Sequence, residues 1–401
     1  MEQVAEYKFK YAKLSENPTI LEINAEIERL TALKNDAKND DSAWKINNNS
    51  VYGVVGFEGY FGYNKLVAQT VTKESELLIK YTISITNEYF RNFHNNGKVI
   101  DALKCKKVVV DYDVVNYADT DSIFPVLNDL YIKSEYDGDF VSFLLHLYKV
   151  DFKEYLEGKF RDWITEKSGI YRKPIPEDSL VIELELINHA VIWLAKKKYI
   201  RTWSYKEGVR FDFLDKIEIK GIEVAQSSTP KWVREKLTEL IKYIMANGKN
   251  LNLSKLGDEL VAIKSEFNTI DYNNTCKILK ITDYETFVIN DVDNIVIGKD
   301  CDPHIRGAAY YNYLVRKHKL ENRYGLIKSN DKVQFFYTKD DPILDAFSFP
   351  VGEPFDPRFT PKINKNLQFE KLILNPINNI IESLNLKPIT SNLIIDPTFI
   401  W

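Results

Sequence analysis

The chain has 401 residues, of which 44% are hydrophobic and 28% charged, and its formal net charge is −4. This is an ordinary globular composition, and the length suffices for two or three domains. Proteins that bind duplex nucleic acid are more often basic overall. The total charge therefore gives no support to such a function, and only a local cluster of basic residues would.

Cysteine usage and hydropathy exclude other classes of protein. The three cysteines, Cys105, Cys276 and Cys301, lie far apart, which argues against a disulfide framework or a zinc motif and predicts a reducing, cytoplasmic location. No apolar run reaches the roughly 18 residues of a membrane-spanning helix, and the N-terminus lacks a signal-peptide pattern. We therefore expect no membrane partner.

Helices are predicted for the first quarter of the chain. Residues 1–40 form two helical segments separated near Pro18, and the second runs from Thr19 to about Lys38. Its apolar residues recur with a period near 3.6, at Ile20, Ile23, Ile27, Leu30 and Leu33. In the first segment a basic face is typical of a solvated stripe, and it consists of Lys8, Lys10 and Lys13.

Strands and helices are mixed in the rest of the chain, which predicts the α+β fold class. The expected elements are a helix at 64–94, a hairpin at 107–127, an amphipathic helix at 140–167 with its aromatic residues in the core, strands within 180–224 that begin with Val181–Ile187, and a helix at Ala308–His318. Thr229 and Pro230 are typical of a helix start, because a capping hydroxyl precedes a proline at the first helical position. That helix is expected to end near Gly248.

Two aspartates lie one residue apart between two apolar stretches. Lys107–Val115 is rich in β-branched residues, Ile123–Leu127 is apolar, and Tyr-Ala-Asp-Thr-Asp-Ser at 117–122 lies between them. This pattern predicts two strands that meet at a tight turn with Asp119 and Asp121 at its tip. Mg²⁺ is usually held by one or two carboxylates together with substrate phosphates, as in two-metal phosphoryl transfer. An Asp-x-Asp pair alone is also typical of a solvated turn or a helix cap.

A lysine, an asparagine and a tyrosine recur at helical spacing upstream of this turn. Lys45, Asn49 and Tyr52 lie at i, i+4 and i+7, so a helix places them on one face. Lysine neutralises a triphosphate as a point charge, and a tyrosine one turn further on packs on a base pair. Gly53 and Gly56 allow backbone to approach a base pair closely. Lys45 by itself also fits an exposed lysine.

The two motifs resemble those of family B DNA polymerases. Lys-x3-Asn-Ser-x-Tyr-Gly-x2-Gly at 45–56 is similar to the second motif of that family, and the hexapeptide at 117–122 is similar to the third. The resemblance implies a right-hand architecture, with partial fingers at 1–57, the palm at 58–222 and the thumb at 223–401.

The resemblance also implies roles for the motif residues. Asp119 and Asp121 would be catalytic and would hold two Mg²⁺ ions as the cofactor. Lys45, Asn49 and Tyr52 would bind the incoming dNTP.

Three later segments resemble motifs of the same family. Lys196–Arg210 contains six basic residues and one acidic residue, and its Lys-Lys-x-Tyr start is similar to a motif that grips the duplex backbone without reading sequence. A solvated edge strand is the alternative. Ile219–Lys231 resembles the segment that joins palm to thumb in T-even-like phage polymerases. Cys301–Ala308 resembles a thumb motif of that subgroup, although it also fits a capped loop before a helix. The implied contacts to primer-template DNA are Gly53, Lys196, Lys197, Lys198, Tyr199, Arg201, His304 and Arg306.

Parts of such a polymerase are not found in the sequence. The first motif, Asp-x2-Ser-Leu-Tyr-Pro, and the acidic motifs of the exonuclease are absent. We therefore expect a split polymerase whose N-terminal polypeptide supplies the exonuclease and the first-motif aspartate across a large apolar interface. The apolar tail Phe399, Ile400 and Trp401 either binds a sliding clamp or packs on the thumb.

The function predicted is the addition of dNTPs to a primer 3′ end, by this chain together with its partner. A non-catalytic DNA-binding or processivity subunit with the same fold is the first alternative, and the intact Asp119, Asp121 and Lys45 argue against it. A different metal-dependent nucleotidyl transferase is the second, and the thumb segments argue against it.

Overall fold

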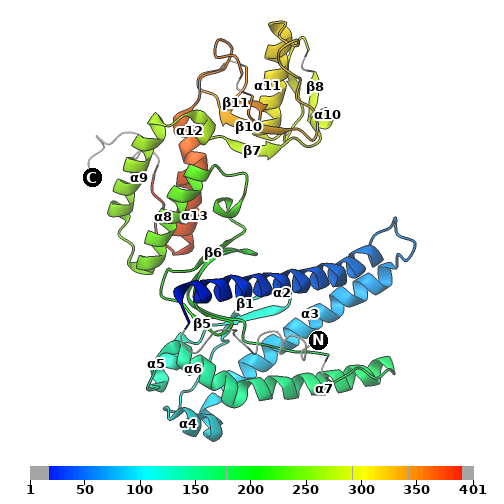
Figure 1. Ribbon diagram of the computed structural model, residues 1–401, viewed down its shortest axis with the longest axis vertical. Helices are drawn as coiled ribbons and strands as arrows, with labels where there is room; N and C mark the ends of the chain where they lie inside the picture. The colour runs from blue at the N-terminus through cyan, green and yellow to red at the C-terminus, as the bar shows by residue number, and fades with distance from the viewer. Residues whose placement is uncertain (1–17, 178, 291, 342, 354, 391–401) are drawn as a thin grey trace. The chain divides into compact units, whose positions relative to one another are not determined.

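The computed structural model describes residues 18–390, apart from 178, 291, 342 and 354. The chain divides into two compact units, Met1–Ile182 and Glu183–Trp401, so the boundary falls inside the range predicted as palm. The strand pairs in the described part of the chain are antiparallel. Together with the many helices (Figure 1), they confirm the predicted α+β class.

The first unit is mainly helical, with a small two-stranded sheet (Figure 1). Its elements are α2 (Ile20–Val55), α3 (Lys65–Arg91), α4 (Gly97–Leu103), β1 (Val115–Asp119), β2 (Ser122–Pro125), α5 (Asn128–Ser134), α6 (Phe140–Leu147) and α7 (Lys153–Tyr171). A π-helical turn, Tyr148–Phe152, joins α6 to α7. The helix predicted at 140–167 is therefore confirmed, and Phe143 and Phe160 lie in the core as expected.

Helix α2 carries the Lys45 motif. It begins where predicted, because the Thr19 hydroxyl accepts from the backbone N–H of Glu22 and the Glu22 carboxylate accepts from the N–H of Thr19, which is a capping box. The predicted end near Lys38 is wrong. The sequence contains no glycine or proline between Thr19 and Gly53, and asparagines alone interrupt a helix only weakly.

The predicted apolar face of α2 is only partly buried. Ile20, Ile23 and Ile27 are exposed, and Leu30 and Leu33 are half-buried. A period of 3.6 identifies a helix face, but a neighbouring element must be present to cover it. The described part of this chain leaves most of that face open.

Helix α3 anchors the core of the first unit. The predicted helix at 64–94 is confirmed, and the Asn64 side chain caps it by accepting from the N–H of Val67. Its N-terminal half is largely exposed, whereas Ile85, Tyr89 and Phe90 in the second half are buried. The second half therefore lies in the interior, against α4, α6 and the segment that leads into β1.

The predicted hairpin is present but shorter than expected. Strands β1 and β2 pair antiparallel, whereas residues 107–114 form no strand. Val108 and Val110 are nevertheless buried in the core of the first unit. Val109 between them is exposed. The side chains of this segment thus alternate between buried and exposed although the segment has no partner strand.

The described part of the second unit contains a four-stranded, a three-stranded and a two-stranded antiparallel sheet together with helices. Its elements are β3 (Leu186–Ala195), β4 (Lys198–Lys206), β5 (Val209–Arg210), β6 (Ile217–Lys220), α8 (Lys231–Asn247), α9 (Leu253–Thr269), β7 (Lys277–Lys280), α10 (Tyr284–Phe287), β8 (Val288–Asn290), β9 (Val296–Ile297), α11 (Pro303–Lys317), β10 (Lys332–Tyr337), β11 (Ala346–Pro350), α12 (Lys365–Phe369) and α13 (Asn375–Ser383). Strand β4 pairs with β3, β5 and β6, and β10 lies between β11 and β7. Strands β8 and β9 form a separate short pair.

The strands predicted within 180–224 are confirmed except at their start. The predicted strand Val181–Ile187 is wrong for all but its last two residues. Leu186 begins β3 opposite Lys206, the last residue of β4, so the residues before Leu186 have no strand to pair with. Ile182 instead packs against a hydrophobic cluster of the first unit.

Two helix starts in the second unit differ from the prediction. Helix α8 ends at Asn247 as expected, but Pro230 takes the N-cap position and the Thr229 hydroxyl donates to the Glu223 carbonyl at 2.6 Å. Helix α11 begins at Pro303 rather than Ala308, with Asp302 at its N-cap. The proline at the first turn is a normal helix start.

Gly307 allows α11 to lie directly on β11. A Cβ at this position would be 2.6 Å from Oγ of Ser348 and 2.8 Å from the carbonyl carbon of Phe347. The Ser348 hydroxyl also donates to the His304 carbonyl at 2.7 Å, in the buried contact between the two elements. The glycine in the Cys301–Ala308 segment is thus required by packing.

We expect Gly307→Ala to lower the free energy of unfolding of the second unit by about 1–3 kcal/mol, because the added methyl group meets backbone that cannot move aside. Gly257→Ala in α9 is the matched control. Nothing lies within 4 Å of a Cβ at Gly257, so alanine should stabilise by about 0.5–1 kcal/mol there. Denaturant titration followed by tryptophan fluorescence measures both. Equal effects of the two substitutions would refute the packing explanation.

Candidate functional site

The tip of the β1–β2 hairpin presents the two aspartates as predicted. Asp119 pairs with Ser122, which leaves Thr120 and Asp121 as the turn. The N–H of Asp121 donates to the Asp119 carbonyl at 2.7 Å, and the Ser122 hydroxyl donates to the same carbonyl at 3.1 Å. Thr120 has φ = 56°, a value that a β-branched residue seldom adopts. No local sequence pattern indicated this tight, strained backbone, which is common at functional sites.

The two carboxylates fit part of a metal site. Asp119 is half-buried and accepts from the Thr120 hydroxyl at 3.1 Å, whereas Asp121 is exposed. Carboxylate oxygens are the ligands that Mg²⁺ prefers. Among the described residues, no group of three or more His, Cys, Asp or Glu side chains is placed to hold a metal ion. A complete site at this turn therefore needs donors in addition to these two residues.

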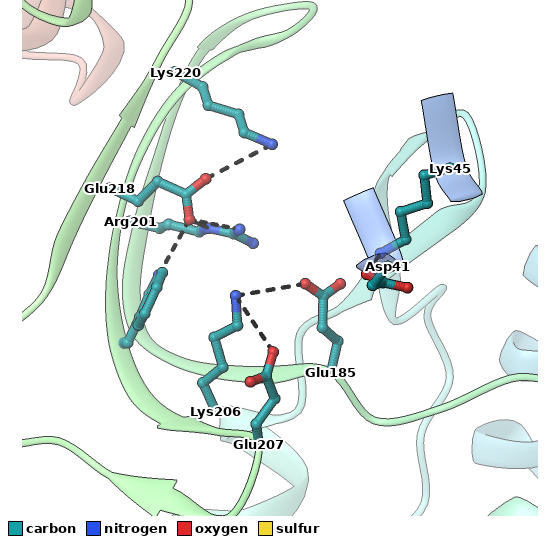
Figure 2. Close-up of polar contacts among 9 residues, drawn as sticks. Asp41, Lys45, Glu185, Arg201, Lys206, Glu207, Glu218 and Lys220 are labelled. Atoms are coloured by element: carbon teal, nitrogen blue, oxygen red, sulfur yellow. Dashed lines mark hydrogen bonds and ion pairs between the residues drawn. The ribbon is translucent and has the colours of Figure 1, made fainter. Parts of the chain in front are cut away.

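Lys45, Asn49 and Tyr52 lie on α2, so the predicted helical spacing is realised. The three side chains are exposed, and the Lys45 Nζ lies 2.8 Å from Oδ2 of Asp41 one turn earlier (Figure 2). An exposed pair of this kind contributes little to stability. Nothing lies within 4 Å of a Cβ placed on Gly53, and the surface beside Tyr52 is therefore open.

Helix α3 contacts both halves of this candidate site. The Tyr52 hydroxyl and Oγ1 of Thr72 on α3 are 2.8 Å apart. Because Thr72 donates its own proton to the Ala68 carbonyl, Tyr52 is the donor. Further along α3, both β1 and β2 contact the helix.

The basic run predicted to contact DNA forms a hairpin turn in the second unit. Lys196 and Lys197 form the turn between β3 and β4, Lys198 begins β4, and all three are exposed. The edge-strand alternative is wrong for β4, which is paired on both sides, but it holds for β5, whose Arg210 lies exposed at the edge of the sheet. Three neighbouring exposed lysines are suited to phosphate contacts.

Tyr199 and Arg201 are enclosed, which corrects their prediction as direct duplex contacts. Tyr199 is 2% exposed and Arg201 8%. Arg201 forms an ion pair with Glu218 at 2.7 Å, and the Trp203 indole N–H donates to the same carboxylate at 3.2 Å (Figure 2). Burial alone would raise the pKa of Glu218, but the hydrogen bond and charge of Arg201 outweigh it and the pKa is lowered. These contacts link β4 to β6 behind the lysine turn.

Gly221 supports the lysine turn from behind. It follows β6 with φ = +69°, and a Cβ there would overlap the Lys197 carbonyl and lie 2.9 Å from Cγ of Lys198. Lys220 beside it is held near Glu218 at 3.7 Å (Figure 2). The Ile219–Lys231 segment thus touches the basic turn through its glycine.

The side chains of His304 and Arg306 also make contacts within the second unit. His304 is 9% exposed, and burial lowers its pKa. Arg306 forms a two-pronged pair with Asp345, with Nε–Oδ1 at 3.0 Å and Nη2–Oδ2 at 2.6 Å, and it also donates to the Cys301 carbonyl. The hydrogen bond to Asp345 raises the pKa of Arg306. Both side chains thus have contacts within the fold, and the duplex contact of either one stays a prediction.

Two predicted features lie outside the described residues. They are the basic face of Lys8, Lys10 and Lys13, and the candidate clamp-binding tail of Phe399, Ile400 and Trp401. None of the helices in residues 18–390 is long and apolar enough to cross a membrane.

Comparison with known proteins identifies the relationship. Residues 26–135, which contain both the Lys45 helix and the aspartate hairpin, match the sequence model of DNA polymerase family B. The chain is similar to the DNA-directed DNA polymerase of Enterobacteria phage T4, with 24% identity over 282 residues, and to that of Escherichia phage RB69, with 24% identity over 278 residues. The chain is related to the family B DNA polymerases of T-even phages.

The relationship covers most of this chain but a minor part of its relatives. The alignments include 68% and 67% of this chain, and 28% of the T4 and of the RB69 polymerase. The activity of the complete polymerases is therefore a proposal for this chain.

We expect Gly221→Ala to disturb the lysine turn. Gly208 is the matched control, because it has φ = +87° but nothing within 4 Å of a Cβ. Both substitutions should lower the free energy of unfolding by about 1–2 kcal/mol, because alanine disfavours a left-handed backbone. Gly221→Ala should cost about 1–3 kcal/mol more from overpacking, with faster amide exchange at 195–200. If both variants lose the same free energy of unfolding in denaturant titration, the contact with Lys197 does not contribute to stability.

Proposed function

We propose that this chain forms the catalytic C-terminal part of a template-directed DNA polymerase, which adds dNTPs to a primer 3′ end. The observation that carries the proposal is the family B match at residues 26–135. It includes the helix of Lys45 and the turn of Asp119 and Asp121 in one segment. The architecture we propose is that of a right hand, with partial fingers at 1–57, palm at 58–222 and thumb at 223–401.

In the proposed reaction, the primer 3′ hydroxyl attacks the α-phosphate of the dNTP in line and pyrophosphate leaves. Asp119 and Asp121 would hold the Mg²⁺ ions that supply charge stabilisation to the attacking and leaving oxygens. Lys45 neutralises the triphosphate, an assignment supported by its exposure and its weak pairing with Asp41. Tyr52 lines the nascent base pair, with its ring restrained by the hydrogen bond to Thr72.

The duplex is held by the exposed lysines of the β3–β4 turn in our proposal. Lys196, Lys197 and Lys198 neutralise phosphates, which makes binding sensitive to salt and insensitive to sequence. Arg201 and Tyr199 act behind them by fixing the turn.

The metal site is completed, we propose, by a carboxylate from outside this sequence. The absence of the first motif from the sequence and the incomplete donor set among the described residues support this. The additional carboxylate comes either from a separate N-terminal polypeptide, as a split polymerase requires, or from another part of a longer chain. Primer extension by this chain alone, and then with the N-terminal part of a T-even-type polymerase, tests the requirement. We expect extension only in the second case.

A non-catalytic DNA-binding subunit is the second candidate, and the exposed lysine turn is the observation that favours it. Such a subunit would bind primer-template DNA with strong salt dependence. It would also add no nucleotides when the N-terminal part is supplied.

We expect Asp121→Asn to reduce nucleotide addition by the assembled enzyme at least about 100-fold, since even outer-shell partners of metal ligands contribute 10–100-fold. Asp111→Asn is the matched control, because it removes the same charge from an exposed residue ahead of the hairpin. Single-turnover primer extension measures the rate, and co-purification shows that assembly is kept. An active Asp121→Asn enzyme would remove this residue from the site.

A further inference from the structure

Asn87 lies in the buried half of α3, distant in sequence from the aspartate hairpin. It is 7% exposed. Its side-chain oxygen accepts hydrogen bonds from two successive backbone N–H groups, those of Val114 at 3.0 Å and Val115 at 3.1 Å. A single oxygen atom on α3 therefore accepts both hydrogen bonds at the point where the chain enters β1.

These two amides bond to Asn87 rather than to the partner strand. Val115 is opposite Pro125, and the register shifts between Val115 and Tyr117. Across the hairpin, the N–H of Val126 donates to the Val114 carbonyl at 2.8 Å. Val114 is 1% exposed, so water does not replace a lost partner of its N–H there. Asn87 thus takes the place of a further strand at the open end of the hairpin.

A hairpin of this size needs such an anchor. Strand β1 has five residues and β2 has four, and an isolated two-stranded hairpin is only marginally stable in water. Asp119 lies at the other end of β1 from Val115, so a shift at the open end is transmitted to the tip. Catalytic side chains must be held to within about 0.5 Å of their productive geometry.

We infer that Asn87 is a positioning residue, which fixes the register of the β1–β2 hairpin and thereby the placement of Asp119 and Asp121. The inference rests on the proposed function of that turn. Asn87 itself touches neither metal nor nucleotide in this arrangement, and it acts through the backbone of Val114 and Val115.

The first test measures the hydrogen bonds directly in the full chain. Asn87→Leu keeps the size and removes the acceptor, whereas Asn87→Asp keeps an acceptor oxygen. Amide hydrogen exchange of the peptide at 114–124 should be at least about 10-fold faster in Asn87→Leu and close to wild type in Asn87→Asp. Asn92→Leu is the control, since Asn92 is an exposed residue at the C-cap of the same helix and its side chain donates to the Glu88 carbonyl.

The second test measures positioning in the assembled polymerase. In primer extension, Asn87→Leu should raise the Mg²⁺ concentration for half-maximal rate by about 10-fold, with unchanged affinity for primer-template DNA. Asn87→Asp should restore the wild-type Mg²⁺ dependence. A change in stability alone would lower the amount of active enzyme without moving this midpoint.

Three results would overturn the inference. They are unchanged amide exchange in Asn87→Leu, an unchanged Mg²⁺ midpoint, and an Asn87→Asp enzyme as impaired as Asn87→Leu. If Asn87→Leu does not fold, Asn87→Ser, which is smaller and too short to reach both amides, takes its place with the same expectations. If the wild-type assembly extends no primer, the proposed function fails, and the exchange measurement still decides whether Asn87 holds the hairpin.

Discussion

Every role proposed for the first unit depends on helix α3 as a rigid support. The helix is buried along one half and exposed along the other, and it contacts both α2 and the β1–β2 hairpin. Thr72 in the exposed half holds the Tyr52 hydroxyl, and Asn87 in the buried half holds the start of β1. Neither the hairpin nor the exposed face of α2 has enough packing of its own to define its position. A single well-anchored helix therefore sets the relation between the lysine motif and the carboxylates.

Several motif residues of the second unit make contacts that stabilise the fold. Arg201 is buried and pairs with the half-buried Glu218, and removal of one partner would leave the other charge uncompensated. Arg306 fastens α11 to Asp345, and Gly307 lets that helix approach β11. A basic residue in a motif can therefore serve as a duplex contact only where it is exposed.

The candidate metal site is built on strained backbone but has few donors of its own. Thr120 at φ = 56° brings Asp119 and Asp121 together within one tight turn. Two carboxylates suit a divalent cation that is also bound by substrate phosphates. A full two-metal site requires more oxygen ligands than these two carboxylates, and our proposal assigns them to further polypeptide.

The sequence by itself determined the class of fold, the starts of α2 and α3, the aspartate turn and the helical face of Lys45, Asn49 and Tyr52. These depend on local signals such as capping residues, periodicity and turn chemistry, which act over a few neighbouring residues. Only the tertiary structure decided that Tyr199 and His304 are buried, that residues before Leu186 lack a partner strand, and that Asn87 holds the hairpin. The physical reason is that burial and pairing depend on residues distant in sequence. Asn87 and Val114 are 27 positions apart, and no local pattern links them.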